Sequence, residues 1–543
     1  MKTCMLLTII CISVFATFNC LSASPITVPM EHWSYDFIER LQAKGILKDY
    51  LSNTKPYTRD EVAEIIFHTS EMLKKGSIKL SKIQKAHLEE LKKEFAQELE
   101  ELGMPETEEY RHLLNWSDGK RTFVTDVGII QDATLKAGDE NYKIFNTTLE
   151  LDFYGKIKEG LYISSNSDYS YEESNEPQPI WKPYVSRYPY RATTNAYLVF
   201  NLPWIGLQIG KDQIQWGPGY HGVVGLSAID PSFDFIKLPF EIWKIKFTSL
   251  VGVLRDNIKD ENGSLIRKNL SAHRVEIRPY SGICIAWQEA YVYARDTQLA
   301  MINPIMPYQM AEDYFGDIGN NTMEGDIDIC LIPNTRVYTS LFLDDYHPNS
   351  NPFKRAGFRW AILGGFLIVD PLGFEDFDIR AEYARVEPWV YAHKGTVQKH
   401  PIPTSYKNFD TPLGHWIGPN ADDLLLEANY YLTKDLQATA SYNKIREGEI
   451  GGNIYEYDNN ILEFGEKEFL GGVVESKQTF NIGLEYRIFQ DSVIKLDYSY
   501  IKINNKQTEE AKLPNMTRYE NPTWVAGNDW SQNIIKASLR LRY

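Results

Sequence analysis

Residues 533–543 alternate strictly between apolar and polar side chains. One face would carry Ile535, Ala537, Leu539, Leu541 and Tyr543, and the other would carry Lys536, Ser538, Arg540 and Arg542. Lipid offers no partner for backbone N–H and C=O groups, so a membrane-spanning sheet must close into a barrel with apolar residues outward and polar residues inward. An edge strand of a soluble sandwich gives no reason for two arginines on its inner face. The pattern therefore predicts an all-β transmembrane barrel of the outer membrane.

Residues 1–23 are predicted to be a cleaved secretory signal peptide. Lys2 is followed by an apolar stretch over residues 5–18 and then by the small residues Ser22, Ala23 and Ser24, with cleavage expected after Ser22 or Ala23. After this segment the longest apolar run, residues 361–369, is much shorter than the roughly 18–20 residues that a membrane helix needs. A membrane-embedded form of this chain must therefore cross the bilayer as strands.

The composition is acidic and rich in aromatic residues. The formal net charge is −16, with 34 Tyr and 12 Trp, as expected when a polar lumen and polar loops surround a lipid-facing band edged by aromatic girdles. The acidity argues against nucleic acid as a partner, because no basic stripe is present to neutralise phosphates. Cys284 and Cys330 follow the signal and could form one disulfide, but no zinc-site spacing exists, and we predict no metal and no cofactor.

Residues 24–105 are predicted to form a small α-helical periplasmic domain. Apolar residues at positions 33, 37, 38 and 41 have helical spacing, and Gly45 is placed to end that helix. Residues 58–61, Thr-Arg-Asp-Glu, are a capping box for a second helix. Ser81 opens a third helix that runs to about Leu102. Residues 106–121 then form a linker.

Residues 122–543 are predicted to form the barrel. From about Thr122 the apolar period becomes that of a strand. Residues 424–432 and 436–442 form one hairpin, and residues 482–488 and 494–500 form another. At roughly 20–26 residues per strand the length predicts about 16 to 20 strands, and the number is even if both chain ends lie in the periplasm.

Long polar loops alternate with the short turns of these hairpins. We expect the loops at 166–190, 296–325, 393–422, 445–476 and 504–530. Tight periplasmic turns and extended outer loops are typical of outer-membrane barrels.

The helical domain resembles an S-layer homology domain. The resemblance rests on Trp33, on residues 41–46 and on residues 56–63, which include the Thr-Arg-Asp-Glu segment. It implies binding to a cell-wall polymer such as peptidoglycan, with Trp33 and Arg59 as candidate binding residues and Arg59 as the forked cation. The chain has one copy where the family commonly has three, so a capped helix pair that acts as a periplasmic lid remains an alternative.

Residues 210–222 contain the turn Trp216-Gly-Pro-Gly. A nucleotide-binding loop is excluded, because no helix follows and Pro218 lies inside the segment. We expect the turn to present Trp216, Tyr220 and His221 at the rim of the barrel.

Four further segments carry a second resemblance. Residues 408–422, 320–326, 344–346 and 387–391 are similar to the Wzi family of capsule assembly proteins. This resemblance extends over about residues 200–450. It implies a barrel of about eighteen strands with a periplasmic helical bundle, which acts as a lectin that holds capsular polysaccharide at the cell surface.

Candidate polysaccharide-binding residues are aromatic and polar side chains in loops. Sugars present apolar C–H faces and many hydroxyls, so aromatic platforms combined with carboxylates and amides suit them. The main candidates are Trp216, Tyr220, His221, Asp344, Asp345, His415 and Trp416, and a wider set adds Trp181, Tyr184 and Tyr308. The alternative is that the aromatic residues form interfacial girdles and that the loop aspartates cap turns.

Enzyme signatures are missing from the sequence. It has neither a Gly-x-Ser-x-Gly elbow nor a His-Glu-x-x-His helix. Asp344 and Asp345 are adjacent, so on a strand they point to opposite faces and are poorly placed to act as acid and base on one bond. We therefore expect a non-enzymatic protein that binds capsular or other surface polysaccharide. Its further partners would be outer-membrane lipid and, through Tyr543, the barrel-assembly machinery.

Two alternatives remain open. One is a carbohydrate-selective porin with a wall-binding head, and the other is a barrel hydrolase that acts on surface lipid or glycan.

Overall fold

The computed structural model describes most of the chain. The described residues are 25–105, 108–175, 190–202, 205–229, 232–256, 267–294, 297, 299–315, 319–346, 350–397, 400–409, 411–452, 454, 465–507 and 523–543. The predicted signal peptide lies outside them, as do Trp181 and Tyr184. Among the described residues, no helix has both the length and the apolar character needed to cross a membrane.

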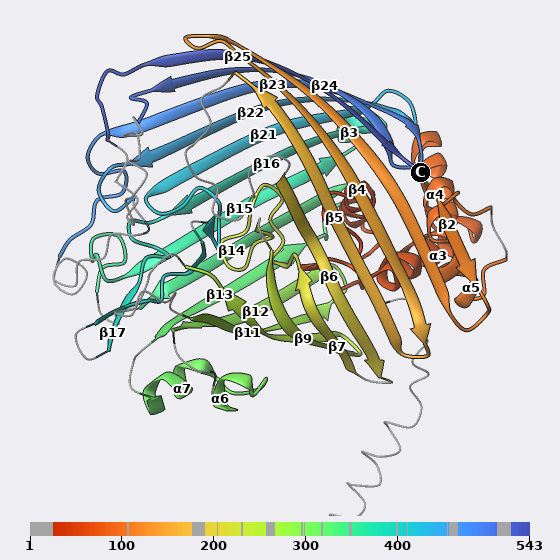
Figure 1. Cartoon of the computed structure of the whole chain (residues 1–543), viewed down its shortest axis with the longest axis horizontal. Coiled ribbons are helices and arrows are strands. Elements are labelled where there is room, and N and C mark those ends of the chain that lie inside the picture. Colours follow the sequence, from red (N-terminus) through yellow and green to blue (C-terminus); the bar gives the residue numbers. More distant parts are fainter. Residues whose placement is uncertain are drawn as a thin grey trace, which may run out of the picture.

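Eighteen antiparallel strands close into a barrel (Figure 1). They are β3 (Thr122–Gly138), β4 (Tyr142–Lys158), β5 (Leu161–Ser174), β6 (Tyr190–Leu202), β7 (Ile205–Asp212), β9 (Phe233–Ile242), β10 (Ile245–Leu254), β11 (Lys268–Tyr280), β12 (Ile283–Tyr293), β13 (Gly319–Ile329), β14 (Thr335–Asp345), β15 (Arg359–Val369), β16 (Phe377–Val386), β21 (Ala421–Tyr431), β22 (Leu436–Gly448), β23 (Val474–Phe489), β24 (Ser492–Asn504) and β25 (Trp530–Arg542). The predicted all-β transmembrane barrel is confirmed.

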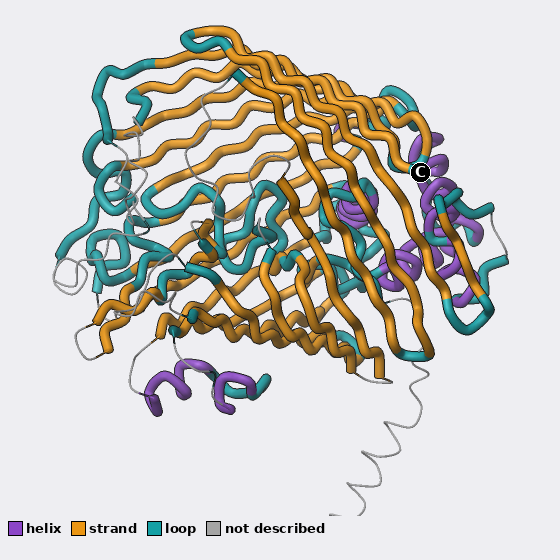
Figure 2. Tube along the Cα trace, in the orientation of Figure 1, coloured by secondary structure: helices purple, strands orange, loops and turns teal. Residues whose placement is uncertain are grey.

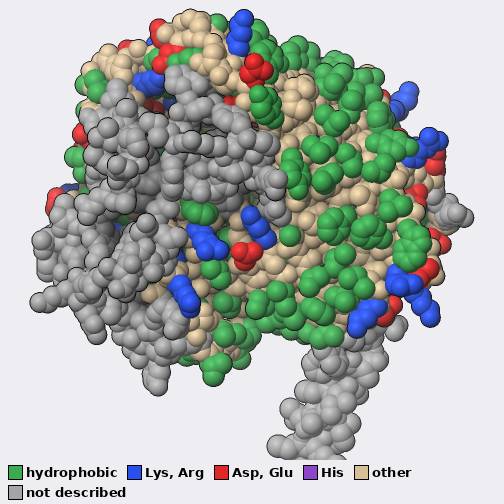
Figure 3. Space-filling model, in the orientation of Figure 1, with side chains coloured by type: hydrophobic (Ala, Val, Ile, Leu, Met, Phe, Trp, Pro, Cys, Tyr) green, Lys and Arg blue, Asp and Glu red, His purple; other side chains and the backbone are tan. Residues whose placement is uncertain are grey.

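The barrel closes where the last strand pairs with the first. β25 runs antiparallel to β3, with Ile535 opposite Leu135. The polar face of β25 lines the interior, where Arg540 pairs with Glu150 at 2.9 Å and Arg542 pairs with Asp152 at 2.5 Å. Apolar side chains cover the outer face of the neighbouring strands (Figure 3). The alternation predicted for residues 533–543 is therefore confirmed.

The two ends of the barrel differ. Short turns at one end include residues 159–160, 243–244, 281–282, 432–435 and 490–491. The connections at the other end, which we call the loop end, are longer, except for the turn of residues 139–141. Both predicted hairpins are present, as β21–β22 and β23–β24. The loops after β5 and before β13 are shorter than predicted, because β5 extends to Ser174 and β13 already begins at Gly319.

Four helices gather at the short-turn end, which we call the head end (Figure 2). They are α2 (Ser34–Ala43), α3 (Arg59–Lys74), α4 (Lys82–Glu94) and α5 (Ala96–Glu101). The capping box predicted at Thr58 forms, and Ser81 opens a helix as predicted, with a capping box of its own. Gly45 follows α2 with a left-handed φ of 71°. The third predicted helix is interrupted at Phe95. A strand that was not predicted, β2 (Leu114–Ser117), lies in the linker and pairs with β3.

The head, residues 25–105, reaches into the barrel. The segment after α2 forms β1 (Thr54–Lys55), which pairs inside the lumen with β8 (Gln215–Trp216). Glu39 of α2 lies 3.1 Å from the ammonium of Lys55, 3.4 Å from the guanidinium of Arg336 and 2.8 Å from that of Arg380. The head is therefore attached to the interior wall by buried ion pairs.

An apolar core fills one side of the lumen. The connection between β7 and β9 and the long connection between β16 and β21 fold inward and pack against β10–β16. The second connection carries two small hairpins, β17 (Lys394–Val397) with β18 (His400–Pro403), and β19 (Lys407–Asn408) with β20 (Thr411–Pro412). On the other side a cavity of about 550 Å³ remains, lined by residues 27–33 and by polar side chains of β3–β5 and β23–β25.

Two expectations from the sequence differ from the structure. Trp216 does not lie at a rim: its side chain is only 1% exposed. Pairing of β8 with β1 draws this large apolar ring into the core, where burial is favourable. The disulfide that the sequence allowed is not formed, because Cys284 and Cys330 are buried free thiols.

Candidate functional site

The two loop segments that carried the strongest sequence motifs enter the lumen from the loop end and meet inside it. The indole Nε1 of Trp416 donates a hydrogen bond of 2.8 Å to the backbone carbonyl of His221. The ring of His221 meets the indole edge-on at a centroid distance of 5.2 Å, and the ring of His415 stacks on it at 5.7 Å. The Trp416 side chain remains 44% exposed. We call Tyr220, His221, His415 and Trp416 the loop-end cluster.

His415 holds the indole of Trp416 in place within this cluster. It is fully buried, and Gly222 packs so closely that a Cβ there would lie 2.6 Å from the imidazole Nε2. Burial, with a smaller contribution from His221, lowers the pKa of His415 to about 3. The backbone N–H of His415 donates to the hydroxyl of Tyr391 at 3.0 Å. His415 is therefore neutral and fixed in position, and its ring supports the exposed indole of Trp416.

A carboxylate on β16 holds the other loop. The backbone N–H groups of Tyr220 and His221 donate to the two carboxylate oxygens of Glu382 at 2.7 and 2.8 Å. The guanidinium of Arg380 lies 3.4 Å from the centroid of the Tyr220 ring. The Tyr220 hydroxyl donates to Glu427 at 3.1 Å. These contacts fix the loop against the wall, because hydrogen bonds to a charged acceptor are among the strong ones.

Carboxylates on the inner face of β21 border the loop-end cluster. The His221 Nε2 lies 3.5 Å from a carboxylate oxygen of Asp423. Glu427, on the same inner face, accepts the hydrogen bond from the Tyr220 hydroxyl. Asp422 points to the opposite face of the strand, where it pairs with Arg446 and accepts a hydrogen bond of 3.1 Å from the Tyr383 hydroxyl. An exposed aromatic platform thus adjoins the inner-face carboxylates of Asp423 and Glu427, and this combination suits a ligand with apolar faces and many hydroxyls.

The other predicted binding residues lie elsewhere. Asp344 is buried, accepts a hydrogen bond of 2.7 Å from the backbone N–H of Tyr391 and lies 3.4 Å from the Arg359 guanidinium. Asp345 is partly exposed and pairs with the same guanidinium at 2.7 Å. Their binding of polysaccharide stays a prediction, as does that of the buried Trp216.

Tyr308 lies on the outside of the barrel, where its ring packs at a tilt against that of His273 at a centroid distance of 4.7 Å. It is not part of the loop-end cluster. Trp181 and Tyr184 lie outside the described residues.

Glu382 and Arg380 were missed by the sequence reading. Residues 377–386 alternate, and this places both side chains on the inner face of a strand. The alternation could have marked them as lumen residues. It carries no information on which loop folds back to meet them.

The two head residues proposed to bind a wall polymer are held by internal contacts. Arg59 pairs with Glu98, donates a hydrogen bond of 2.8 Å to the Glu94 carbonyl and lies over the rings of Phe95 and Tyr154. The Trp33 ring lies 4.0 Å from the guanidinium of Arg487. To bind a polymer, Arg59 would have to exchange its partner Glu98. Wall binding by Arg59 and Trp33 stays a prediction.

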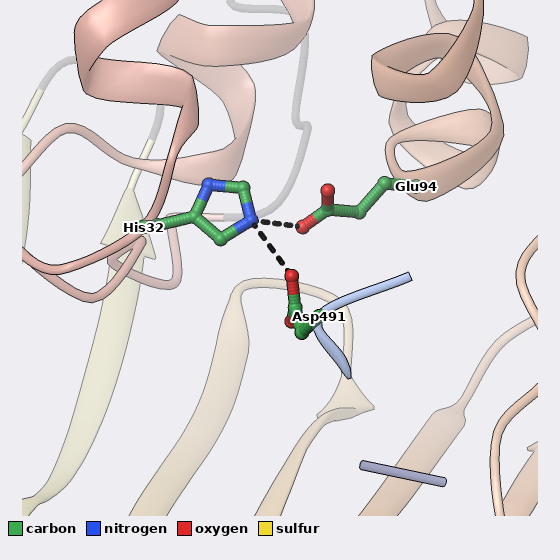
Figure 4. A group of neighbouring side chains, drawn as sticks. All are labelled: His32, Glu94 and Asp491. Carbon is green, nitrogen blue, oxygen red and sulfur yellow. Dashed lines mark ion pairs between the residues drawn. The ribbon is translucent and has the colours of Figure 1, made fainter. Parts of the chain in front are cut away.

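A cluster of three ionisable side chains joins the head to a barrel turn at the end of the lumen cavity (Figure 4). The His32 Nε2 lies 2.8 Å from Glu94 of α4 and 3.6 Å from Asp491 of the β23–β24 turn. Burial opposes protonation of His32, but the two carboxylates outweigh it and raise its pKa to about 9. The three ligand atoms lie within 4.8 Å of one another, a spacing that a cation would accept. A protonated His32 accounts for the cluster without a metal.

The sequence model of the family "Capsule assembly protein Wzi" matches residues 317–516. No curated protein matches the chain.

The solved structure of Wzi, an outer-membrane protein of Escherichia coli described as involved in group 1 capsule assembly and as a carbohydrate-binding β-barrel, has the same fold. The TM-score is 0.56 with 12% identity, and the match covers 96% of this chain and 99% of that one. OccD3 of Pseudomonas aeruginosa gives a TM-score of 0.43 with 12% identity over 78% of this chain and 91% of that one. The chain thus matches the Wzi family by sequence over residues 317–516, and by fold it matches the Wzi barrel over nearly its whole length.

Proposed function

We propose that this chain is a non-enzymatic outer-membrane lectin that binds capsular or other surface polysaccharide and anchors or assembles it at the cell surface. The observation that carries the proposal is the exposed indole of Trp416, held on a buried His415 beside the carboxylates of β21. The match of residues 317–516 to the Wzi family supports the same function. The loop end then faces the outside and the head faces the periplasm.

The arrangement favours binding over catalysis. Asp344 and Asp345 share the guanidinium of Arg359, and one is buried while the other faces outward. They do not flank a common space in which a glycosidic bond could lie. The role of the loops is then to hold the polymer, and the partner is a polysaccharide.

The proposal is tested by binding and by retention of polymer. Purified protein should bind isolated surface polysaccharide on a glycan array, and the Trp416→Ala variant should bind it much more weakly. In cells, deletion of the gene should leave the polymer made but shed into the medium. Unchanged retention, together with no binding on the array, would refute the proposal.

A carbohydrate-selective porin is the second candidate. The observation in its favour is the cavity of about 550 Å³ on the unfilled side of the lumen. Planar-bilayer recording separates the two candidates: steady open channels of the purified protein would favour the porin, and a closed lumen would favour the lectin.

A further inference from the structure

Two short helices lie outside the ring of strands. α6 (Leu299–Ile302) and α7 (Tyr308–Phe315) belong to the connection between β12 and β13 and pack on the outer side of the wall, α6 next to β10 and α7 next to β12 and β13 (Figure 1). Met301, Tyr308 and Ala311 are fully buried against Tyr291 and Tyr293 of β12. We call residues 299–315, which include both helices and the segment between them, the outer collar.

The outer collar covers polar groups on the outer face of the barrel. Arg274 reaches into the lumen to Asp326 at 2.7 Å, so its neighbour His273 points outward. His273 lies 3.2 Å from Glu289, and both side chains are buried. Glu289 also accepts hydrogen bonds from the backbone N–H of Gln309 at 2.9 Å and from Asn321 at 3.0 Å. Lipid contact would be costly for such groups, and the collar prevents it.

The other side of the outer collar is apolar and exposed. Leu299 is 86% exposed, Ile305 is 78% exposed and Met310 is 64% exposed. Trp287, two residues before Glu289 on the same face of β12, is 40% exposed on the barrel wall. The apolar side of the collar therefore continues the apolar outer surface of the wall.

The length of β12 places the outer collar in the bilayer. β12 has 11 residues, and at about 3.3 Å per residue and a tilt of about 45° it rises by roughly 25 Å, the thickness of the hydrocarbon band of such barrels. The collar covers the part of β12 from Glu289 to the loop end, where the strand is still within this band. We propose that the outer collar is inserted in the leaflet at the loop end and that acyl chains of that leaflet contact Leu299, Ile305 and Met310.

This proposal goes beyond polysaccharide binding, since it concerns the outer wall and not the loop-end cluster. It relies on the transmembrane barrel, and it identifies the leaflet as the outer one only through the proposed orientation. Failure of the lectin proposal would therefore leave it intact.

Site-directed spin labelling in proteoliposomes tests the proposal on the full chain. Single cysteines replace Leu299, Ile305 and Met310 in separate variants and are labelled with a nitroxide. Collision with oxygen, which concentrates in acyl chains, is compared with collision with a water-soluble nickel chelate. Trp287→Cys is the control for a lipid-facing wall position, and Tyr346→Cys, in the exposed connection after β14, is the control for water. Wild-type protein treated in the same way corrects for labelling of Cys284 and Cys330.

We expect the ratio of oxygen to nickel collision rates at positions 299, 305 and 310 to match that at 287 and to exceed that at 346 several-fold. Ratios like that at 346 would overturn the proposal. Spin–spin broadening that grows as the protein-to-lipid ratio rises would also overturn it, because a second copy of the chain would then cover the collar. Three independent positions keep the test decisive if one variant fails to fold.

Discussion

The indole nitrogen of Trp416 donates a hydrogen bond to the backbone carbonyl of His221 across 2.8 Å, which joins two loops that lie 195 residues apart. The hydrogen bond is made by the N–H at the edge of the indole. It helps to fix the ring and leaves the ring partly exposed. A platform that is already held loses little conformational entropy when a sugar stacks on it. The strength of binding should therefore depend on this ring more than on any other loop aromatic.

Replacement of Trp416 by leucine should weaken polysaccharide binding by about 1–2 kcal/mol, or roughly 5- to 30-fold in Kd. Trp287 offers a matched control, because its exposure of 40% is close to the 44% of Trp416 and yet it lies on the outer wall. Isothermal titration with isolated polysaccharide measures both variants. Equal losses in Trp416→Leu and Trp287→Leu would show that the effect is not local to the site.

Glu382→Gln should loosen the loop that carries His221. The neutral amide keeps one acceptor but turns its NH₂ group toward a backbone N–H, so one of the two short hydrogen bonds is lost, at a cost of about 1.5–3 kcal/mol. Glu427→Gln is the control, because it keeps an acceptor for the Tyr220 hydroxyl. Thermal unfolding and polysaccharide affinity should both fall in Glu382→Gln and change little in Glu427→Gln. A larger loss of stability and affinity in Glu427→Gln than in Glu382→Gln would contradict the role given to Glu382.

His415 should make the protein less stable in acid. Its pKa is about 3 in the folded state and about 6.5 in the unfolded chain, so the unfolded state binds the proton first. Stability is therefore retained above about pH 6.5 and is lost as the pH falls toward 3, by on the order of 3 kcal/mol at pH 4. Urea unfolding at pH 7 and pH 4 should show this loss in wild type and a smaller one in His415→Gln, which does not titrate. The same loss in both proteins would contradict the prediction.

The barrel could be predicted because its physics is local and repetitive. Each spanning strand must alternate, so the outward Leu539 and the inward Arg540 could be assigned from their order in the chain. The capping box at Thr58 and the helix start at Ser81 could also be predicted, because each signal lies within one helical turn.

The filling of the lumen could not be predicted, because it depends on contacts between distant residues. Trp216 is buried because β8 meets β1, more than 150 residues earlier in the chain. Glu39 is paired with Arg336 and Arg380 across the interior. Alternation places such side chains on the inner face, but it does not determine which residues they contact. For the same reason the motifs identified His221 and Trp416 singly, and only the fold brings them together.

Glu39→Ala should release the head from the barrel interior. The change leaves Lys55, Arg336 and Arg380 without this shared carboxylate, and loss of one partner of a buried ion pair costs about 3–5 kcal/mol. We expect a lower unfolding temperature and more frequent channel openings in planar bilayers. Glu71→Ala is the control: Glu71 makes only surface pairs with Lys74 and Lys75, which are worth at most about 1 kcal/mol. A similar change in both variants would refute the prediction.

His32 should make attachment of the head sensitive to alkaline pH. The carboxylates of Glu94 and Asp491 raise the folded-state pKa of His32 to about 9, above the value of about 6.5 for an unfolded chain. The stabilisation is complete below about pH 6.5 and is lost as the pH rises through 9, by on the order of 3 kcal/mol. Hydrogen exchange of residues 25–33 and of α4 should therefore accelerate between pH 7 and pH 10, after correction for the intrinsic rate. In His32→Gln the exchange should be fast throughout, with no such pH step, whereas an unchanged step in this variant would assign it to another group.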